Sequence, residues 1–175
     1  REMAESLVLS LVDKGLVTSQ LVLTVGYDRE NLTDPARRSA YRGQVASDRY
    51  GRPVPKHAHG TANLPRASSS TRRIVDAVLA LYDRVVDPAL LVRRLNLTAC
   101  HVEAEAAAAR REAAAACQLD LFTDYAAEQR REEAERQAED REKNIQHAML
   151  DIQKKYGKNA ILKGMDLQEG ATAQE

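Results

Sequence analysis

Few residues in this chain have the types and spacing that catalysis or metal binding requires. His57 and His59 form a His-x-His pair, but no acidic or thiol side chain lies near them in sequence to complete a metal site. Cys100 and Cys117 lie 17 residues apart without a CxxC spacing, and Cys117 has no neighbouring base to activate its thiol. The chain also lacks a Gly-rich phosphate-binding loop. The sequence therefore predicts no catalytic residue and no metal ligand, and the two histidines are expected to be ordinary loop residues.

Binding is better supported than catalysis, because charge is distributed unevenly along the chain. The first hundred residues carry 15 Lys or Arg and 10 Asp or Glu, whereas the remainder carries 11 and 16. Between Asp28 and Arg73, ten basic residues accompany four acidic ones, with tyrosines interleaved. This pattern favours a phosphate backbone as partner, although a solvated loop with inert arginines explains it equally well. The candidate DNA-binding residues are Arg29, Arg37, Arg38, Arg42, Arg49, Arg52, Lys56, Arg72, Arg73, Arg93 and Arg94.

The second candidate for binding is a pentapeptide that holds the only Phe of the chain. Its residues are Gln118, Leu119, Asp120, Leu121 and Phe122. Neither neighbouring segment offers an apolar face, since one is rich in Ala, Arg and Glu and the other is highly charged. Three apolar anchors and an amide are typical of a linear motif that docks in a preformed groove. Alternatively, these apolar side chains pack one helix against the next. The pattern alone supports the two interpretations about equally.

Composition limits the class and the compartment of the protein. The chain has 175 residues, which suffices for one domain with appendages, and its aromatic content of 4% argues against a large aromatic core. Two isolated thiols indicate a reduced, cytoplasmic protein. No apolar run approaches the roughly 18 residues that span a bilayer. The first residues resemble the middle of a helix rather than a signal peptide, so the true N-terminus is expected upstream.

The elements that would position these groups begin with a helix and a strand. Arg1–Lys14 places apolar residues three and four apart, which predicts an amphipathic helix that ends at Gly15. Its expected buried stripe is Met3, Leu7, Val8, Leu11 and Val12. Leu21–Tyr27 is rich in β-branched residues and predicts a strand. Pro and Gly interrupt residues 28–60, which predicts a long hairpin excursion without long elements.

The second half of the domain is predicted to consist of a strand, a helix and a last strand. Thr61–Leu64 predicts a short strand, and Thr71 to about Val86 predicts a helix with N-cap candidates among the preceding serines. The expected buried face of this helix is Ile74, Val78, Leu81, Tyr82 and Val85. Leu90–Thr98 alternates as a last strand, which places Arg94, Asn96 and Thr98 on one side. The order predicts an α+β fold, a small antiparallel or mixed sheet with both helices on one face.

The charged segment Asp124–Tyr156 predicts a long helix supported by i,i+4 ion pairs and ended by Gly157. Its first half is nearly all charged, so it is expected to bury little and to be loosely attached. The second half carries a narrow apolar stripe, either a docking surface or a weak coiled-coil seam. The stripe consists of Ala138, Ile145, Met149, Ile152 and Tyr156.

The pentapeptide resembles the sliding-clamp-binding motif of bacterial DNA polymerases and repair factors, and it matches the fullest form of that motif. The rest of the chain resembles the little-finger domain and tail of Y-family translesion DNA polymerases. This resemblance is carried by Arg1–Leu7, Asp13–Thr18, Leu21–Tyr27, Ser70–Val75 and Leu91–Leu97. Resemblance to the UmuC-like branch is carried by Tyr50–Gly60 and Lys155–Gly164.

The resemblance implies that the catalytic parts of the polymerase lie upstream of this chain. These are the palm with its Mg-binding carboxylates, the fingers, the thumb and the first strand of the little finger. The chain is therefore expected to have no polymerase activity by itself and no cofactor of its own.

The resemblance also implies a C-terminal region that grips double-stranded template-primer DNA on the open sheet face and recruits the sliding clamp during error-prone lesion bypass. The tail helix would contact other polymerase or SOS-response subunits, with no membrane partner. The alternative is a non-catalytic basic scaffold or adaptor that binds nucleic acid and recruits partners. The expected division is a little finger over residues 1–102, a motif-bearing linker over 103–123, a tail helix and turn over 124–164, and a disordered end over 165–175.

Overall fold

The computed structural model describes residues 1–114, 125–157, 160, 161 and 164, and for residues 125–129 and 132 it describes only the backbone. These parts form an α+β domain with a small antiparallel sheet and a long C-terminal helix, which confirms the predicted fold class. None of the helices in the described ranges is long and apolar enough to cross a membrane. The pentapeptide from Gln118 to Phe122 lies outside the described residues.

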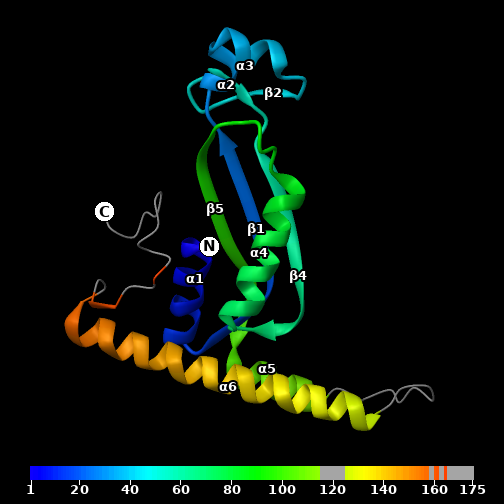
Figure 1. Ribbon diagram of the computed structural model, residues 1–175, viewed down its shortest axis with the longest axis vertical. Helices are drawn as coiled ribbons and strands as arrows, with labels where there is room; N and C mark the ends of the chain where they lie inside the picture. Colours follow the sequence, from blue (N-terminus) through cyan, green and yellow to red (C-terminus); the bar gives the residue numbers. More distant parts are fainter. Residues whose placement is uncertain (115–124, 158–159, 162–163, 165–175) are drawn as a thin grey trace.

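β1 (Leu16–Tyr27) is the central strand of an antiparallel three-stranded sheet (Figure 1). β4 (Ala58–Ser68) and β5 (Val92–Ala104) pair with it on either side. Each strand reaches beyond its predicted range at one end or at both. The reason is that cross-strand hydrogen bonds continue through residues of low strand propensity, such as Gly60, which lies opposite Leu23.

α1 (Glu2–Asp13) and α4 (Thr71–Val85) pack against each other on one face of the sheet. Their apolar side chains form one core cluster with β1, which consists of Ala4, Val8, Leu11, Val12, Leu21, Ile74, Val75 and Val78. The predicted stripe of α1 is wrong at Met3, which is 46% exposed, because the buried positions repeat from Ala4 instead. Burial of this apolar surface is the main force that holds both helices to the sheet.

The start and the packing of α4 follow from two short-range features. Ser70 caps the helix, and its Oγ accepts a hydrogen bond from the Arg73 backbone N–H at 3.4 Å. Further along α4, Leu81 and Val85 lie directly over Gly60 of β4, where an added Cβ would come within 2.8 Å of both side chains. Glycine at this position therefore lets the helix approach the sheet closely.

The excursion between β1 and β4 forms a small tip beyond the end of the main sheet (Figure 1). It contains α2 (Glu30–Thr33), α3 (Pro35–Ala40), and a hairpin of β2 (Val45–Ser47) and β3 (Pro53–Pro55). The sequence predicted an excursion without long elements, and its Pro and Gly residues keep these four elements short.

A buried asparagine ties the tip to the sheet. Asn31 is fully buried, and its Nδ2 donates to the backbone oxygens of Asp28 and Leu91 at 2.8 and 3.0 Å. Its Oδ1 accepts from the Leu91 N–H at 2.9 Å. Because all of these polar groups are paired, the buried amide positions the tip instead of destabilising it.

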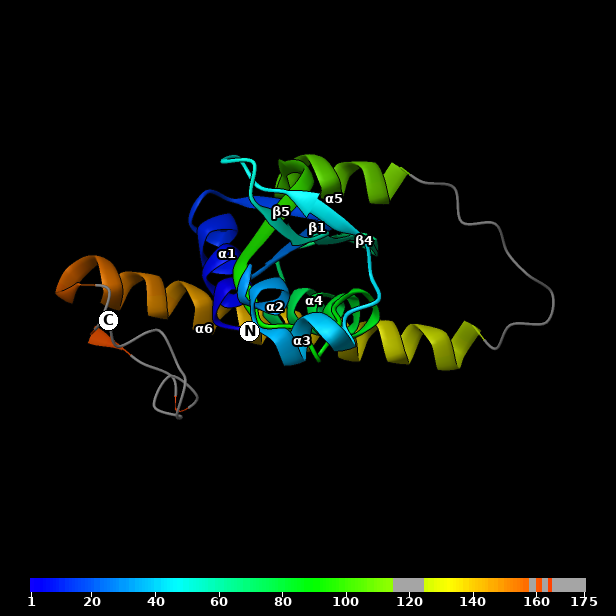
Figure 2. The same cartoon turned by 90° about the horizontal axis from the view of Figure 1, so that it is seen from above.

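Two helices follow β5. α5 (Glu105–Ala114) occupies part of the segment expected to be a linker and buries Ala108. α6 (Tyr125–Tyr156) runs across the end of the domain opposite the tip (Figure 1 and Figure 2) and stops before Gly157, whose φ is 97°. The long helix confirms the prediction for this segment.

The predicted apolar stripe of α6 does not form its contact face. Ile145 and Tyr156 are 62% and 67% exposed. The helix instead turns a mostly polar arc toward the domain, and this arc contains Glu135, Glu139, Glu142, Gln146 and Leu150. Gln146 is only 4% exposed. The polar arc was missed because its carboxylates pair with arginines on other elements, which the periodicity of apolar residues cannot reveal.

Candidate nucleic-acid interface

The sheet exposes a mostly polar face opposite α1 and α4. The register of the strands assigns its side chains, because residues directly opposite each other in a ladder share a face. The open-face residues are Gln20, Val22, Thr24 and Gly26 on β1, His59, Thr61 and Asn63 on β4, and Arg94, Asn96, Thr98 and Cys100 on β5. This set confirms the predicted side for the β5 residues and contains no carboxylate.

Cross-strand hydrogen bonds hold several of these side chains in place. Gln20 Nε2 donates to Asn63 Oδ1 at 2.9 Å, and Thr24 Oγ1 lies 3.0 Å from His59 Nδ1. Gly26 has no side chain and lies opposite Arg94, so a partner can approach the backbone of β1 closely at this point. Such a surface can hold phosphate oxygens through hydroxyl, amide and guanidinium groups without reading a base sequence.

At the tip end, the open face continues into an arginine-lined cavity of about 380 Å³. Five arginines line it, namely Arg29, Arg49, Arg52, Arg93 and Arg94, and the sequence had singled out all of them. Further lining residues include Asp48, Tyr50 and His57. The structure thus brings together residues from β1, the β2–β3 hairpin and β5 that lie up to 68 positions apart in sequence, from Gly26 to Arg94.

Carboxylates neutralise only part of this arginine cluster. Asp48 binds Arg52, with Oδ2 at 2.7 Å from Nη2, and the hydrogen bond from the Arg52 side chain lowers the pKa of Asp48 from 3.8 to about 2. Asp28 lies at the longer distance of 3.4 Å from Arg93. Within the described part of the chain, the guanidinium groups of Arg29, Arg49 and Arg94 have no carboxylate partner. An anion in the cavity would therefore meet unneutralised positive charge.

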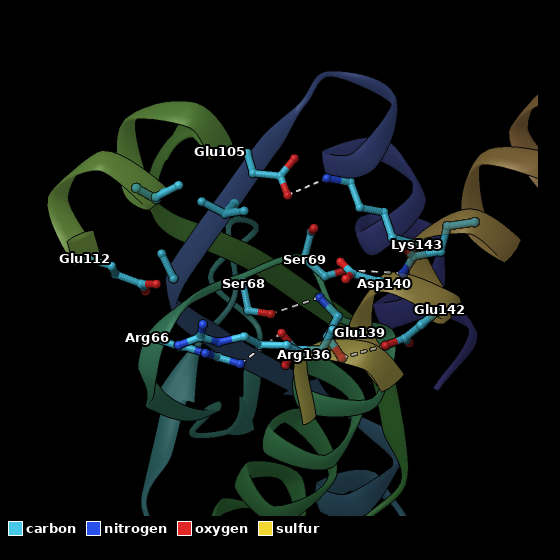
Figure 3. Close-up of a pocket in the computed structure, with 16 residues that line it drawn as sticks. Arg66, Ser68, Ser69, Glu105, Glu112, Arg136, Glu139, Asp140, Glu142 and Lys143 are labelled. Carbon is cyan, nitrogen blue, oxygen red and sulfur yellow. Dashed lines mark hydrogen bonds and ion pairs between the residues drawn. The ribbon is translucent and has the colours of Figure 1, made fainter. Parts of the chain in front are cut away.

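A second polar cavity, of about 250 Å³, lies at the opposite end of the domain between α5, α6 and the start of α4 (Figure 3). Here the carboxylates of the polar arc of α6 bind polar and basic groups of the domain. Glu139 pairs with Arg66 at 2.9 Å and also with Arg73. Glu142 accepts from Ser70 Oγ at 2.7 Å, and from the Arg72 backbone N–H at 3.1 Å. These carboxylates occupy the N-terminal end of α4, where negative charge is favourable.

The remaining predicted contacts are dispersed over the surface. Arg37 and Arg38 lie on α3, and Arg42 follows it and donates to the Ser39 backbone oxygen. Lys56 Nζ donates to Gln44 Oε1 at 2.9 Å. Arg73 is held by Glu135 and Glu139, so it is less available to an outside anion than the tip arginines are.

Sequence reasoning missed the β4 part of the open face. His59, Thr61 and Asn63 alternate with small residues from Ala58 onward, and this alternation signals the strand. The strand was predicted to begin only at Thr61, so His59 was placed in a loop. Among the described residues, no group of three or more His, Cys, Asp or Glu side chains could hold a metal ion.

Comparison with known protein families matches residues 1–121 to the impB/mucB/samB family C-terminal domain. The match therefore covers the sheet, α1, α4, the tip and α5, and it ends before α6. Comparison with curated proteins gives no match, and comparison with solved structures gives none either. Because the match spans well over half of the chain, this protein belongs to the impB/mucB/samB C-terminal domain family, a non-catalytic C-terminal part of UmuC-like Y-family polymerases.

Proposed function

We propose that this chain is the DNA-binding and clamp-recruiting C-terminal region of an error-prone translesion polymerase. One observation carries the DNA-binding part: the open sheet face has no carboxylate and runs into the arginine-lined cavity. Membership of a polymerase-associated family makes DNA the fitting polyanion. The duplex lies along β1, β4 and β5, with one strand of phosphates directed toward the tip.

Binding that does not depend on the base sequence suits a DNA duplex as partner. Hydroxyl and amide side chains, together with Arg93 and Arg94, bind phosphate oxygens and leave the base edges untouched. Association releases condensed counterions, so binding weakens steeply as the salt concentration rises. A lesion in the template would not disturb these contacts, since they do not depend on the bases.

Recruitment to the sliding clamp rests on the pentapeptide, for which sequence is the support. Leu121 and Phe122 fill an apolar pocket of the clamp, Leu119 adds contact, Gln118 bonds to the pocket rim, and Asp120 faces solvent. A peptide with so few anchors binds with about micromolar affinity, because ordering the peptide offsets part of the contact energy. Tethering to a domain already on DNA raises the effective concentration enough for assembly.

Salt titration of duplex binding tests the DNA-binding part. The full chain is titrated with a labelled blunt duplex at several salt concentrations, beside the double variant Arg93→Ala/Arg94→Ala. The variant is expected to bind more weakly on every duplex sequence, with a slope of log K against log salt shallower by about 2.

The matched control is Arg110→Ala/Arg141→Ala, which removes the same charge from exposed positions on α5 and α6. It should behave like the unmodified chain. If both double variants lost the same affinity for DNA, the effect would be due to net charge and not to the positions of Arg93 and Arg94. Absence of salt-sensitive binding by the unmodified chain would refute the proposal.

A further inference from the structure

The tip presents one aromatic ring in an unusual setting. Tyr50 lies in the turn between β2 and β3 and is 66% exposed. The guanidinium carbons of Arg49 and Arg52 lie 4.8 and 4.9 Å from its ring centroid. A large ring placed in solvent beside two cations has little role in the core, so its use is to be sought outside the domain.

The turn that carries Tyr50 is rigidly built. Asp48 Oδ1 accepts from the backbone N–H groups of Tyr50 and Arg52 at 2.8 and 3.0 Å, and the Gly51 N–H donates to the Asp48 backbone oxygen at 3.0 Å. Gly51 adopts a φ of 75°, which the left-handed position of the turn requires. Asp48 also fixes Arg52 through Oδ2. The ring is therefore held at a defined place beside the cavity.

The positive charge beside the Tyr50 ring is available to an anionic ligand. Arg49 has no carboxylate partner in the described part of the chain, and the same is true of Arg29 and Arg94 across the cavity. Arg52 by contrast is retained by Asp48. Arg49 can therefore leave the ring for an incoming phosphate, and the ring face that it uncovers becomes free for a flat group.

We infer that the tip binds an unpaired nucleotide, with its base stacked on Tyr50 and its phosphates in the arginine-lined cavity. This inference rests on the proposed function and adds a second DNA contact to it. The base must be unpaired, because neighbours in a duplex cover both faces of every internal base. Stacking on an aromatic side chain tolerates any base, since all bases have a π-face. The ligand is thus the single strand next to the duplex that the sheet holds.

The test uses the full chain and two DNAs with equal numbers of phosphates, one a blunt duplex and the other a shorter duplex with a single-stranded overhang. The overhang carries 2-aminopurine, whose fluorescence falls when the base stacks. The unmodified chain should quench this probe and should prefer the overhang DNA by about tenfold. Tyr50→Ala should abolish the quenching and the preference, so that it binds the two DNAs with the same affinity. Tyr50→Phe should retain both, because it keeps the ring.

Tyr156 supplies the matched control. It is 67% exposed and has Lys155 at 5.2 Å from its ring centroid, but it lies at the end of α6. The Tyr156→Ala variant should quench the 2-aminopurine fluorescence and prefer the overhang DNA to the same extent as the unmodified chain. Unchanged preference in Tyr50→Ala would overturn the inference, and so would an equal loss of affinity for both DNAs. Failure of the unmodified chain to bind the blunt duplex would instead count against the proposed function itself.

Discussion

At the scale of single residues, carboxylates decide which arginines remain available to an anion. Asp48 neutralises Arg52 in the tip, and Glu139 neutralises Arg73 at the other end of the domain. Arg94 has no such partner among the described residues and stands on the open face next to Gly26. From the sequence alone these arginines are equivalent candidates, because partners brought together by folding cannot be read from sequence spacing.

The Asp48 carboxylate should titrate far below an ordinary aspartate. Its pKa is lowered from 3.8 to about 2, chiefly by the hydrogen bond from the Arg52 side chain. Since the folded-state pKa is the lower one, the stabilisation is complete above about pH 4 and is lost as pH falls toward 2. An NMR titration of the side-chain carboxyl checks the value.

Two arginine variants test the cause of this shift. Arg52→Ala should return the pKa of Asp48 toward 3.8. Arg49→Ala is the control, because Arg49 contacts the Tyr50 ring and has no ion pair with Asp48. Equal effects of the two substitutions would show that general positive charge, and not the hydrogen-bonded pair, sets the pKa.

At the scale of elements, helices and strands with a periodic apolar pattern could be predicted from the sequence. The contact face of an element that is attached through polar side chains could not. α4 was placed within a residue of its observed end, because its Ser70 cap and buried stripe are both local signals. The length of α6 was predicted for a similar reason, since its i,i+4 pairs are local. Its contact face was not, because Glu139 and Glu142 dock onto Arg73 and Ser70, far away in sequence.

Docking of α6 should therefore depend on Glu139. The substitution Glu139→Gln breaks ion pairs with Arg66 and Arg73, whose side chains are 30% and 20% exposed. Partly exposed pairs contribute about 1 kcal/mol at most, so amide exchange between Glu135 and Gln146 should accelerate roughly fivefold. Hydrogen exchange followed by mass spectrometry measures this rate.

Glu133→Gln is the matched control, because Glu133 is exposed on the same helix and has no ion pair within the described residues. It should leave exchange unchanged. In both proteins α6 should exchange faster than α4, which buries Ile74, Val78 and Leu81. Exchange in α6 as slow as in α4, with or without Glu139, would mean that its ion pairs are not what holds it.

At the scale of the whole molecule, the proposed DNA contacts and the clamp motif occupy separate parts of the chain. The open face and the tip belong to β1, β4, β5 and the β2–β3 hairpin, whereas α6 crosses the opposite end (Figure 1). The motif falls between α5 and α6, outside the described residues. DNA and clamp should therefore be bound independently of each other.

Replacing Leu121 and Phe122 with Ala should separate these two activities. Loss of the two apolar anchors should remove roughly 2–4 kcal/mol of clamp binding, hence most detectable complex. Duplex affinity should stay the same. Titration of purified clamp into labelled peptides that cover residues 115–125 measures the first effect, and the Asp120→Ala peptide serves as control. Equal clamp affinity of the native and double-Ala peptides would show that Leu121 and Phe122 do not anchor the peptide to the clamp.

Duplex binding by the open sheet face can be tested directly with a map of backbone amide shifts in the full chain on addition of blunt duplex DNA. If the open face binds the duplex, the shifts should concentrate in Gln20–Gly26, His59–Asn63 and Arg94–Thr98, the three strand segments of that face. Amides of α1 and the central turns of α4, which cover the other face, should move little. Shifts concentrated on those helices, with the open face unchanged, would show that the duplex does not bind to the open face.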